Sequence, residues 1–167
     1  MATNENLKEA FAGESQANRK YLAFAKKAEQ EGKPGVARLF RAAAAAETVH
    51  AHAHLRVMGG IKSTADNLQA AIEGEGFEFQ DMYPKFVQLA EQEKNKAAAV
   101  SFKNAMAVEE IHHRLYREAL EALKAGRDFE AGDRMYVCEV CGNTVKGAPP
   151  AKCPVCNSPK ERFFYVD

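Results

Sequence analysis

The chain lacks two features, an excess of charge of one sign and any long apolar run. Lysine plus arginine and aspartate plus glutamate each number 23 among its 167 residues. This balance argues against binding to nucleic acid or to an anionic membrane surface through overall charge. The longest alanine run, Ala42 to Ala46, is far shorter than the roughly 20 apolar residues of a membrane-spanning helix. We therefore expect no nucleic acid and no membrane among its partners.

Cysteine is absent from most of the chain. All four cysteines lie within residues 138–156, as two Cys-x-x-Cys pairs. Residues 1–6 have neither the basic nor the apolar region of a secretory signal peptide. Clustered cysteines without such a signal favour metal binding over disulfides. We therefore expect a cytoplasmic protein.

Glycine and proline, which interrupt helices, are sparse up to about residue 125. This region is rich in Ala, Glu, Lys and Leu, a composition typical of helices. The predicted helices cover residues 5–31, 36–58, 75–94 and 97–125, the third with a kink near Pro84. The polar segment 61–74 is predicted to carry a long crossover. We therefore expect a mainly α protein with a four-helix bundle over residues 1–125.

One arrangement of potential metal ligands occurs twice in this helical region. In each copy a lone glutamate precedes a Glu-x-x-His pair: Glu14, Glu47 and His50 in the first, and Glu75, Glu109 and His112 in the second. The second copy follows the first by 61 residues at the lone glutamate and by 62 at both members of the pair. An extra glutamate, Glu78, stands one helical turn after Glu75, where the first copy has Ala17.

A single Glu-x-x-His on a helix is usually a solvated pair, but these two fall on the apolar faces of their predicted helices. A glutamate from each of two helices, plus a Glu-x-x-His from each of two others, is the ligand set of a dimetal site in a four-helix bundle. The other candidates lie off the ligand positions. Glu110, His113 and His52 are predicted to be surface residues, and His54 a core residue or a neighbour of the ligands.

The ligand types narrow the choice of metal. Five carboxylates buried together need compensating positive charge, which two metal ions supply. Oxygen-rich ligation with one imidazole per metal suits iron or manganese. Glu47 and Glu109 are placed to bridge the two ions, whereas Glu14 and Glu75 are predicted to bind one ion each.

The four cysteines predict a second metal site, after a polar linker at residues 126–135. Cys138, Cys141, Cys153 and Cys156 form two knuckles separated by 11 residues. Four thiolates close a tetrahedron around one metal, and a domain of about 30 residues, here 136–167, has too little core to fold without it. A zinc ribbon uses the same ligands, so the spacing alone leaves structural zinc and iron both open. A dimetal site that changes redox state needs an electron donor, and this need favours iron.

Over essentially its whole length the sequence resembles the rubrerythrin family. The resemblance rests on residues 11–16, the two Glu-x-x-His pairs, the stretch from Gly74 to Pro84 and the terminal cysteine knuckles. It implies a ferritin-like four-helix bundle with a carboxylate-bridged di-iron site, joined to a small C-terminal rubredoxin-like FeCys4 domain. It also implies a homodimer or larger homo-oligomer, in which the FeCys4 domain of one chain lies near the di-iron site of its neighbour.

The resemblance also assigns roles to individual residues. Glu78 and His50 are implied to be alternative ligands of one iron, the carboxylate in the oxidised state and the imidazole in the reduced state. Tyr21 lies two turns from Glu14 on the same helix face. We expect Tyr21 and Tyr83 either beside the ligands, with Tyr21 as a hydrogen-bond donor to a carboxylate, or as plain core residues.

The function predicted from these features is that of an oxidoreductase. We expect a non-haem peroxidase that reduces hydrogen peroxide to water in oxidative-stress defence. Its electrons are expected to come from rubredoxin or an NAD(P)H-dependent reductase and to pass through the FeCys4 centre. One alternative is a ferroxidase or iron-storage protein of the ferritin class, which uses oxygen and has no need of the cysteine site. Another is a scaffold whose dimetal site and zinc ribbon are both structural.

Overall fold

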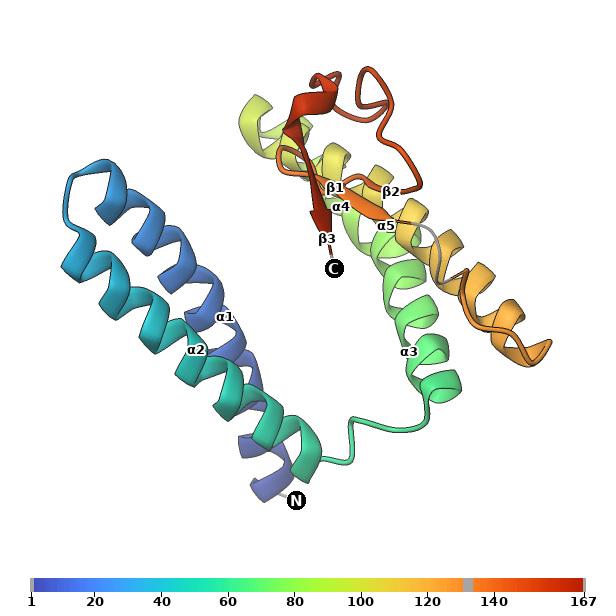
Figure 1. Ribbon diagram of the computed structural model, residues 1–167, viewed down its shortest axis with the longest axis horizontal. Coiled ribbons are helices and arrows are strands. Elements are labelled where there is room, and N and C mark those ends of the chain that lie inside the picture. Colours follow the sequence, from blue (N-terminus) through green and yellow to red (C-terminus); the bar gives the residue numbers. More distant parts are fainter. Residues whose placement is uncertain (1, 131–133, 167) are drawn as a thin grey trace. The chain divides into compact units, whose positions relative to one another are not determined.

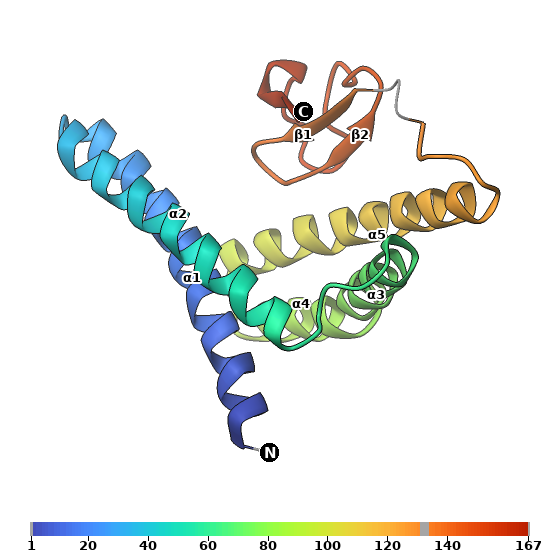
Figure 2. The same ribbon diagram turned by 60° about the horizontal axis from the view of Figure 1, so that its bottom comes forward.

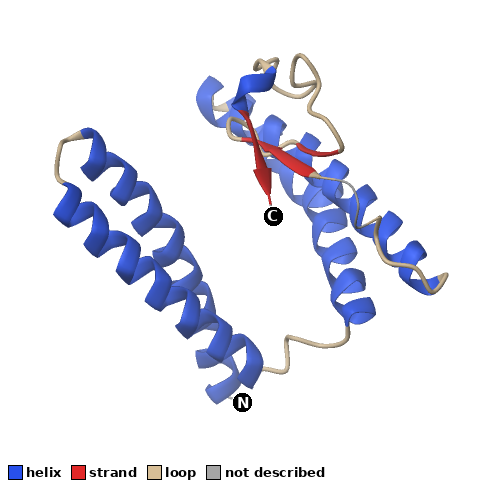
Figure 3. Cartoon of the chain, in the orientation of Figure 1, coloured by secondary structure: helices blue, strands red, loops and turns tan. Residues whose placement is uncertain are grey.

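The computed structural model describes residues 2–130 and 134–166. The protein is mainly helical, with a small sheet near the C-terminus (Figure 3), so the predicted fold class is confirmed. The chain divides into two compact units, Met1–Lys62 and Ser63–Asp167. Among the helices of the described residues, none combines the length and the apolar character needed to cross a membrane.

The first unit is an antiparallel pair of helices, α1 (Ala2–Gln30) and α2 (Pro34–Val57) (Figure 1). Gly32 makes the turn between them with a φ of 68°, a conformation that suits glycine. Small side chains make the contact between the two helices, since the buried apolar residues are Ala25, Ala28, Ala37, Ala44 and Ala51. Such side chains allow a short distance between helix axes.

One buried polar residue fixes the alignment of α1 on α2. The Asn18 side-chain amide donates hydrogen bonds to the Ala44 carbonyl oxygen at 2.7 Å and to the Thr48 hydroxyl at 2.8 Å. A buried amide that is satisfied in one alignment is left without partners in any other. Asn18 lies one turn after Glu14, and Thr48 follows Glu47. The hydrogen bonds therefore hold these two glutamates level.

The second unit begins with a helix that starts earlier than predicted. Helix α3 spans Thr64–Phe77, and the Ser63 hydroxyl caps it by accepting a hydrogen bond from the Asp66 backbone N–H at 3.1 Å. The prediction of a long crossover over residues 61–74 is therefore wrong. Its polar residues form a helix cap and a first turn, and the connection from α2 is only residues 58–63.

The helix continues without a break through a π-helical turn, η1 (Glu78–Met82), into α4 (Tyr83–Gln92). In this turn the Tyr83 backbone N–H donates to the Glu78 carbonyl oxygen, five residues earlier. Helix α5 (Lys96–Lys124) then returns and packs against α3, η1 and α4. Asn95 caps its start by accepting a hydrogen bond from the Ala98 backbone N–H at 3.1 Å.

The end of the chain forms a three-stranded antiparallel sheet with the strand order β2-β1-β3. The strands are β1 (Met135–Cys138), β2 (Thr144–Lys146) and β3 (Phe163–Val166), and a 3-10 turn, η2 (Lys160–Arg162), precedes β3. Tyr136 at the centre of β1 pairs with Val145 on one side and Tyr165 on the other. The sheet lies beside α5 (Figure 2).

Candidate metal centres

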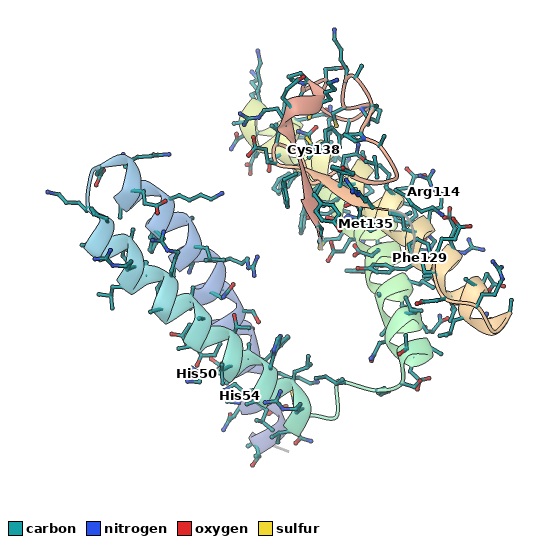
Figure 4. All side chains as sticks on the ribbon, viewed as in Figure 1. His50, His54, Arg114, Phe129, Met135 and Cys138 are labelled. Carbon is teal, nitrogen blue, oxygen red and sulfur yellow. The ribbon has the colours of Figure 1, made fainter. Side chains whose placement is uncertain are left out.

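The first unit holds one group of three potential ligands, which we call the N-terminal triad: Glu14, Glu47 and His50. One ligand atom from each lies within 4.8 Å of the others. His50 Nδ1 is 2.8 Å from Glu47 Oε2 and 4.0 Å from Glu14 Oε1. Glu14 comes from α1, and the other two from one face of α2, where they are separated by one helical turn. Figure 4 shows the His50 side chain on α2.

The second unit holds the C-terminal triad: Glu75, Glu109 and His112. Its ligand atoms also lie within 4.8 Å of one another. His112 Nδ1 is 2.8 Å from Glu109 Oε2 and 3.8 Å from Glu75 Oε1. These distances nearly repeat those of the N-terminal triad. Each unit therefore brings together the three ligands that its copy of the pattern contains, with the imidazole Nδ1 facing the carboxylates.

The repeat extends beyond the ligands to three aromatic rings, which the sequence reasoning missed. Tyr21, Phe24 and Phe40 form a cluster with ring centroids 5.5 to 6.4 Å apart. A second cluster has centroids 5.5 to 6.3 Å apart and consists of Tyr83, Phe86 and Phe102. Each ring of the second cluster follows its counterpart by 62 residues. This offset was the available signal, because it equals that of the Glu-x-x-His pairs.

The π-turn accounts for the one mismatch in the repeat. From the lone glutamate to the tyrosine is seven residues in the first copy, Glu14 to Tyr21, and eight in the second, Glu75 to Tyr83. The turn η1 lies within the longer interval and takes up the extra residue. Glu78 is its first residue. The glutamate that has no counterpart thus lies at the point where the helix departs from α geometry.

Burial and mutual repulsion mark the carboxylates of the C-terminal triad. Burial raises the pKa of Glu75 to about 7, and the charge of Glu109 adds to the shift while His112 opposes it. Burial also raises the pKa of Glu109, with a further rise from the charge of Glu78 and an opposing hydrogen bond from Glu75. These carboxylates resist being ionised together unless a cation lies among them. The site therefore favours a bound metal ion.

Two tyrosines lie in the field of the same carboxylates. Burial first, and then the charges of Glu78, Glu109 and Glu75, raise the pKa of Tyr83. Burial, Glu75 and Glu109 likewise raise the pKa of Tyr116. Tyr116 was not predicted as a site residue, although it lies one turn after His112 on the same helix. Within the first unit, the Tyr21 ring packs against Phe24 and Phe40.

The remaining titratable residues near the two Glu-x-x-His pairs differ in how far they are buried. Glu110 and His52 are exposed, as predicted. His113 is half-buried: its ring centroid lies 5.3 Å from that of Phe79, and a side-chain carbon added to Gly76 would meet the ring at 3.4 Å. The absence of a side chain at Gly76 leaves space for this imidazole between α3 and α5, so the predicted surface residue is partly covered. His54 is half-buried.

The four cysteines gather into one cluster at the end of β1 and in the two knuckle loops. Cys138 Sγ is 3.7 Å from Cys156 Sγ, and Cys141 Sγ is 3.5 Å from Cys153 Sγ. A tetrahedron with metal–sulfur bonds of about 2.3 Å has sulfur–sulfur edges of about 3.8 Å. The sulfur atoms are therefore spaced for one tetrahedral metal ion.

The thiols differ in how readily they ionise. Burial acts to raise the pKa of Cys156, but hydrogen bonds with Ser158 and neighbouring thiols lower it to about 6. Burial raises the pKa of Cys141 well above its usual range. The buried Asn143 amide donates a hydrogen bond to Cys153 Sγ at 3.6 Å. A cation is needed to hold all four sulfurs as thiolates, and the amide helps to stabilise the charge on one of them.

A chain of hydrogen bonds joins the cysteine cluster to the C-terminal triad. His112 Nε2 lies 2.8 Å from the Thr144 hydroxyl oxygen, and that hydroxyl donates to the Gly142 carbonyl oxygen at 3.0 Å. Gly142 directly follows Cys141. With Nδ1 facing the carboxylates, Nε2 is the ring nitrogen that donates to Thr144. Within this chain the cysteine domain contacts His112, and the implied placement near a neighbouring chain's metal site stays a prediction.

A cavity of about 340 Å³ lies beside His112. Its lining includes Tyr116 of α5, Thr144 of β2, and Phe129 and Met135 on the segment that enters the sheet. Figure 4 labels Phe129 and Met135 on the side of α5 that the sheet faces. The cavity gives a small molecule space next to a ligand of the C-terminal triad.

The donor sets of these sites suit two kinds of iron centre. Carboxylate oxygens with one imidazole per triad suit a pair of iron ions, and four thiolates suit a single iron. Helices carrying two such triads, joined to a small strand domain with four cysteines, define a ferritin-like di-iron protein with an appended FeCys4 domain.

Comparison with known proteins narrows this class to one family. The chain matches the family described as Rubrerythrin over residues 5–120 and the family described as Rubrerythrin, rubredoxin-like domain, over residues 136–164. The chain belongs to the rubrerythrin family. Its cofactors are accordingly the carboxylate-bridged di-iron site of that family and one iron in the cysteine cluster.

Individual relatives agree with this assignment. Rubrerythrin-2 of Clostridium acetobutylicum is 34% identical over 96% of this chain and 95% of its own length. Nigerythrin of Nitratidesulfovibrio vulgaris is 36% identical over 97% of this chain and 85% of its own. A solved structure of nigerythrin in a mixed-valence state covers 98% of this chain and 86% of its own, with a TM-score of 0.58 and 36% identity.

Proposed function

We propose that the protein is a non-haem peroxidase that reduces hydrogen peroxide to water. The family supports a di-iron protein of oxidative-stress defence. Each turnover takes one hydrogen peroxide, two protons and two electrons and yields two waters. When bound, the iron pair supplies Lewis acidity and two electrons, and the FeCys4 iron returns electrons singly. The observation that carries the proposal is the hydrogen-bonded contact between His112 and Thr144.

That contact favours a peroxidase over an iron-storage protein. A protein that only oxidises and stores iron has no need of a second redox centre beside a ligand of the first. Here two hydrogen bonds, His112 to Thr144 and Thr144 to Gly142, lead from the triad to the residue next to Cys141. Electron transfer through so short a bonded route suits a site that must be reduced again after each turnover.

The proposed ligands are the two triads together with Glu78. In this assignment two bound irons would be held by Glu47 and Glu109 as shared ligands, by Glu14 and Glu75 as ligands of one iron each, and by His50 and His112 through Nδ1. Glu78 and His50 would be alternative ligands of one iron, the carboxylate when the iron is oxidised and the imidazole when it is reduced. A hard, anionic carboxylate suits ferric iron, whereas a neutral imidazole serves ferrous iron. The proposed ligands of the single iron are Cys138, Cys141, Cys153 and Cys156.

Other residues of the chain hold protons and provide access. Burial and three nearby carboxylates raise the pKa of Tyr83 above its ordinary value, so its hydroxyl proton is held more firmly still. Tyr83 is therefore placed as a hydrogen-bond donor beside Glu78 and Glu109. The 340 Å³ cavity next to His112 and Tyr116 is large enough for peroxide. These features support a site that admits a small oxidant and supplies hydrogen bonds to it.

The electron donor proposed for the FeCys4 centre is rubredoxin or an NAD(P)H-dependent reductase. The cysteine sulfurs form a metal-binding cluster rather than disulfides, which favours a reducing compartment, and we propose the cytoplasm. The proposed division of labour places the di-iron site in residues 1–125 and electron entry in residues 136–167, joined by a linker at 126–135.

Stoichiometric oxidation of the iron-loaded protein tests this proposal. The protein is reduced anaerobically and titrated with hydrogen peroxide while the absorption of both iron centres is recorded. We expect both centres to be oxidised by peroxide in proportion to two electrons per molecule, and far faster than by oxygen. A matched sample with zinc in the cysteine site should react once and then stop. Faster oxidation by oxygen than by peroxide would identify a ferroxidase and contradict the proposal.

A further inference from the structure

The connection between the two units is short for the fold. In ferritin-like bundles one long crossover joins the second and third helices, which run parallel. Here α2 ends at Val57 and α3 begins at Thr64. Seven residues of fully extended chain span at most about 25 Å. The distance that this connection must cover within one bundle follows from the positions of the ligands.

All ligands of a dimetal site lie at one level along the bundle. Val57 lies seven residues beyond His50 and ten beyond Glu47, so α2 ends about 13 Å past the ligand level at 1.5 Å per residue. Thr64 lies 11 residues before Glu75, so a parallel α3 begins about 16 Å before that level. The two ends are then about 30 Å apart along the axis, with a further 8–10 Å between helix axes. The connection is too short.

Caps at both ends prevent the helices from unwinding to lengthen the connection. The backbone N–H groups of Gly59 and Gly60 donate to Arg56 and Leu55 carbonyl oxygens at 2.9 Å, which holds these residues at the end of α2. Gly59 has a φ of 67°. Ser63 caps α3. Only the few residues between these caps are free to extend.

We propose that each di-iron centre is built from two copies of the chain. The pair α1–α2 of one copy supplies the N-terminal triad, and α3–α5 of the second copy supplies the C-terminal triad. The proposal rests on the ligand set given under the proposed function. Each triad alone provides three ligands, so the centre is incomplete without the second copy. The cysteine domain that contacts His112 then belongs to the copy that supplies the C-terminal triad.

Exposed apolar residues on both units fit a second copy as the occupant. Phe24 and Val36 of the first unit are exposed, as are Phe86 and Val100 of the second. Phe24 and Phe86 are counterparts in the 62-residue repeat and belong to the two aromatic clusters. Faces related by an internal repeat are suited to cover one another across two copies.

The consequence for the reaction is that two chains share one redox switch. Glu78 follows Glu75 on the second unit, and His50 belongs to the first. If they alternate on one iron as proposed, the carboxylate comes from one copy and the imidazole from the other. A variant in one chain can therefore be rescued by its partner.

Paired variants with two affinity tags test this assignment by counting binuclear iron. One chain carries Glu47→Ala and His50→Ala, and the other carries Glu109→Ala and His112→Ala. They are co-expressed, and dimers with both tags are isolated and loaded with iron. Shared centres give one intact centre per dimer, half of the wild-type content. Centres closed within one chain give none, and that result would overturn the proposal.

A second pairing of chains is expected to give the opposite iron contents under the two arrangements. A chain with all four substitutions is paired with the wild-type chain. Shared centres then leave no intact centre in the doubly tagged dimer, whereas closure within one chain leaves half. Binuclear iron is counted by its absorption, without peroxide. If the wild-type protein shows no absorption of binuclear iron, the proposed ligand set is contradicted. If the wild-type protein shows it but the paired variants do not, only the sharing of centres between two chains is contradicted.

Lengthening the connection provides a further check. Twelve Gly and Ser residues inserted between Ile61 and Lys62 allow α2 and α3 to run parallel within one chain. We expect this insertion to retain the wild-type iron content but to lower rescue between the paired variants several-fold. Undiminished rescue would show that the short connection does not dictate the sharing.

Discussion

The two triads have nearly the same internal distances but different surroundings. The His50 side chain is 55% exposed and the His112 side chain 26%, and Glu14 is 33% exposed against 20% for Glu75. The cysteine domain contacts the C-terminal triad through Thr144, and the charge of Glu78, at the start of the π-turn, acts on Glu75 and Glu109. Among the described residues, the C-terminal triad therefore has an electron route and an additional carboxylate within its own unit, and the N-terminal triad has neither within its own. The repeat provides equivalent ligands in the two units. The cysteine domain and Glu78 then make the two triads unequal in function.

The different surroundings of the two triads suggest that the triads have different tasks. The carboxylates of the C-terminal triad are held in a less solvated environment, as the raised pKa values of Glu75 and Glu109 indicate. A less solvated site binds a cation more strongly and leaves less freedom to its ligands. Four predictions test this comparison, in order of decreasing effect.

The largest effect is expected from removing a bridging ligand. Glu109→Ala should abolish binuclear iron and lower peroxide turnover by about 100-fold or more, because a missing bridge leaves the two metals without a shared anion. Iron content and turnover are measured together. Glu110→Ala is the matched control. Glu110 is the exposed neighbour of Glu109, and its substitution should change turnover by less than about twofold. Equal losses in both variants would contradict the ligand assignment.

Glu78 distinguishes the two halves and should affect turnover without affecting metal content. Glu78→Ala is expected to retain both irons while lowering peroxide turnover by about tenfold or more, because the oxidised centre loses its alternative ligand. Asp81→Ala changes an exposed carboxylate in the same π-turn and serves as the control. Full activity in Glu78→Ala removes the proposed role of this residue.

Thr144 connects the cysteine domain to the C-terminal triad of its own unit. Thr144→Val should slow re-reduction of the di-iron centre by up to about tenfold, because His112 loses its hydrogen-bond partner. Rapid-mixing spectroscopy follows the FeCys4 centre as it passes its electron on. Thr144→Ser keeps the hydroxyl and should restore the rate. If valine and serine behave alike, the hydroxyl has no part in electron transfer.

The smallest effect concerns the stability of the metal-free protein. The pKa of Glu75 is raised to about 7 from 4.5, so the folded state binds more protons than the unfolded state between these values. Stability from this group is therefore present below about pH 4.5 and is lost as the pH rises toward 7. The melting temperature should fall by a few degrees over this range.

A substitution at Glu75 checks the origin of that slope. Glu75→Gln, which does not titrate, should flatten the dependence of melting temperature on pH, whereas Glu73→Gln at an exposed position should keep it. Bound metal should reverse the slope, because a metal ion requires the ionised carboxylate. A slope that persists in Glu75→Gln assigns the effect to another group.

Much of the fold and both kinds of ligand group could be predicted from residue types and spacing. Helical periodicity placed Glu47 and His50 on one face, and the structure brings them within 2.8 Å of each other. The cysteine spacing likewise predicted a cluster that the structure contains. Such local patterns depend on one or two elements at a time. The error at residues 61–74 arose because Ser63 and Asp66 suit a loop and a helix cap equally well.

The sequence by itself determined the candidate ligands, their helical faces and the metals they suit, because these follow from side-chain chemistry and a fixed number of residues per turn. Only the tertiary structure decided the rest. It placed the extra residue of the second copy in a π-turn at Glu78, packed His113 over Gly76 and set Thr144 against His112. It also reduced the connection between the units to residues 58–63. These features depend on how distant segments pack and on how far a chain can reach. The spacing of residues along one helix determines neither.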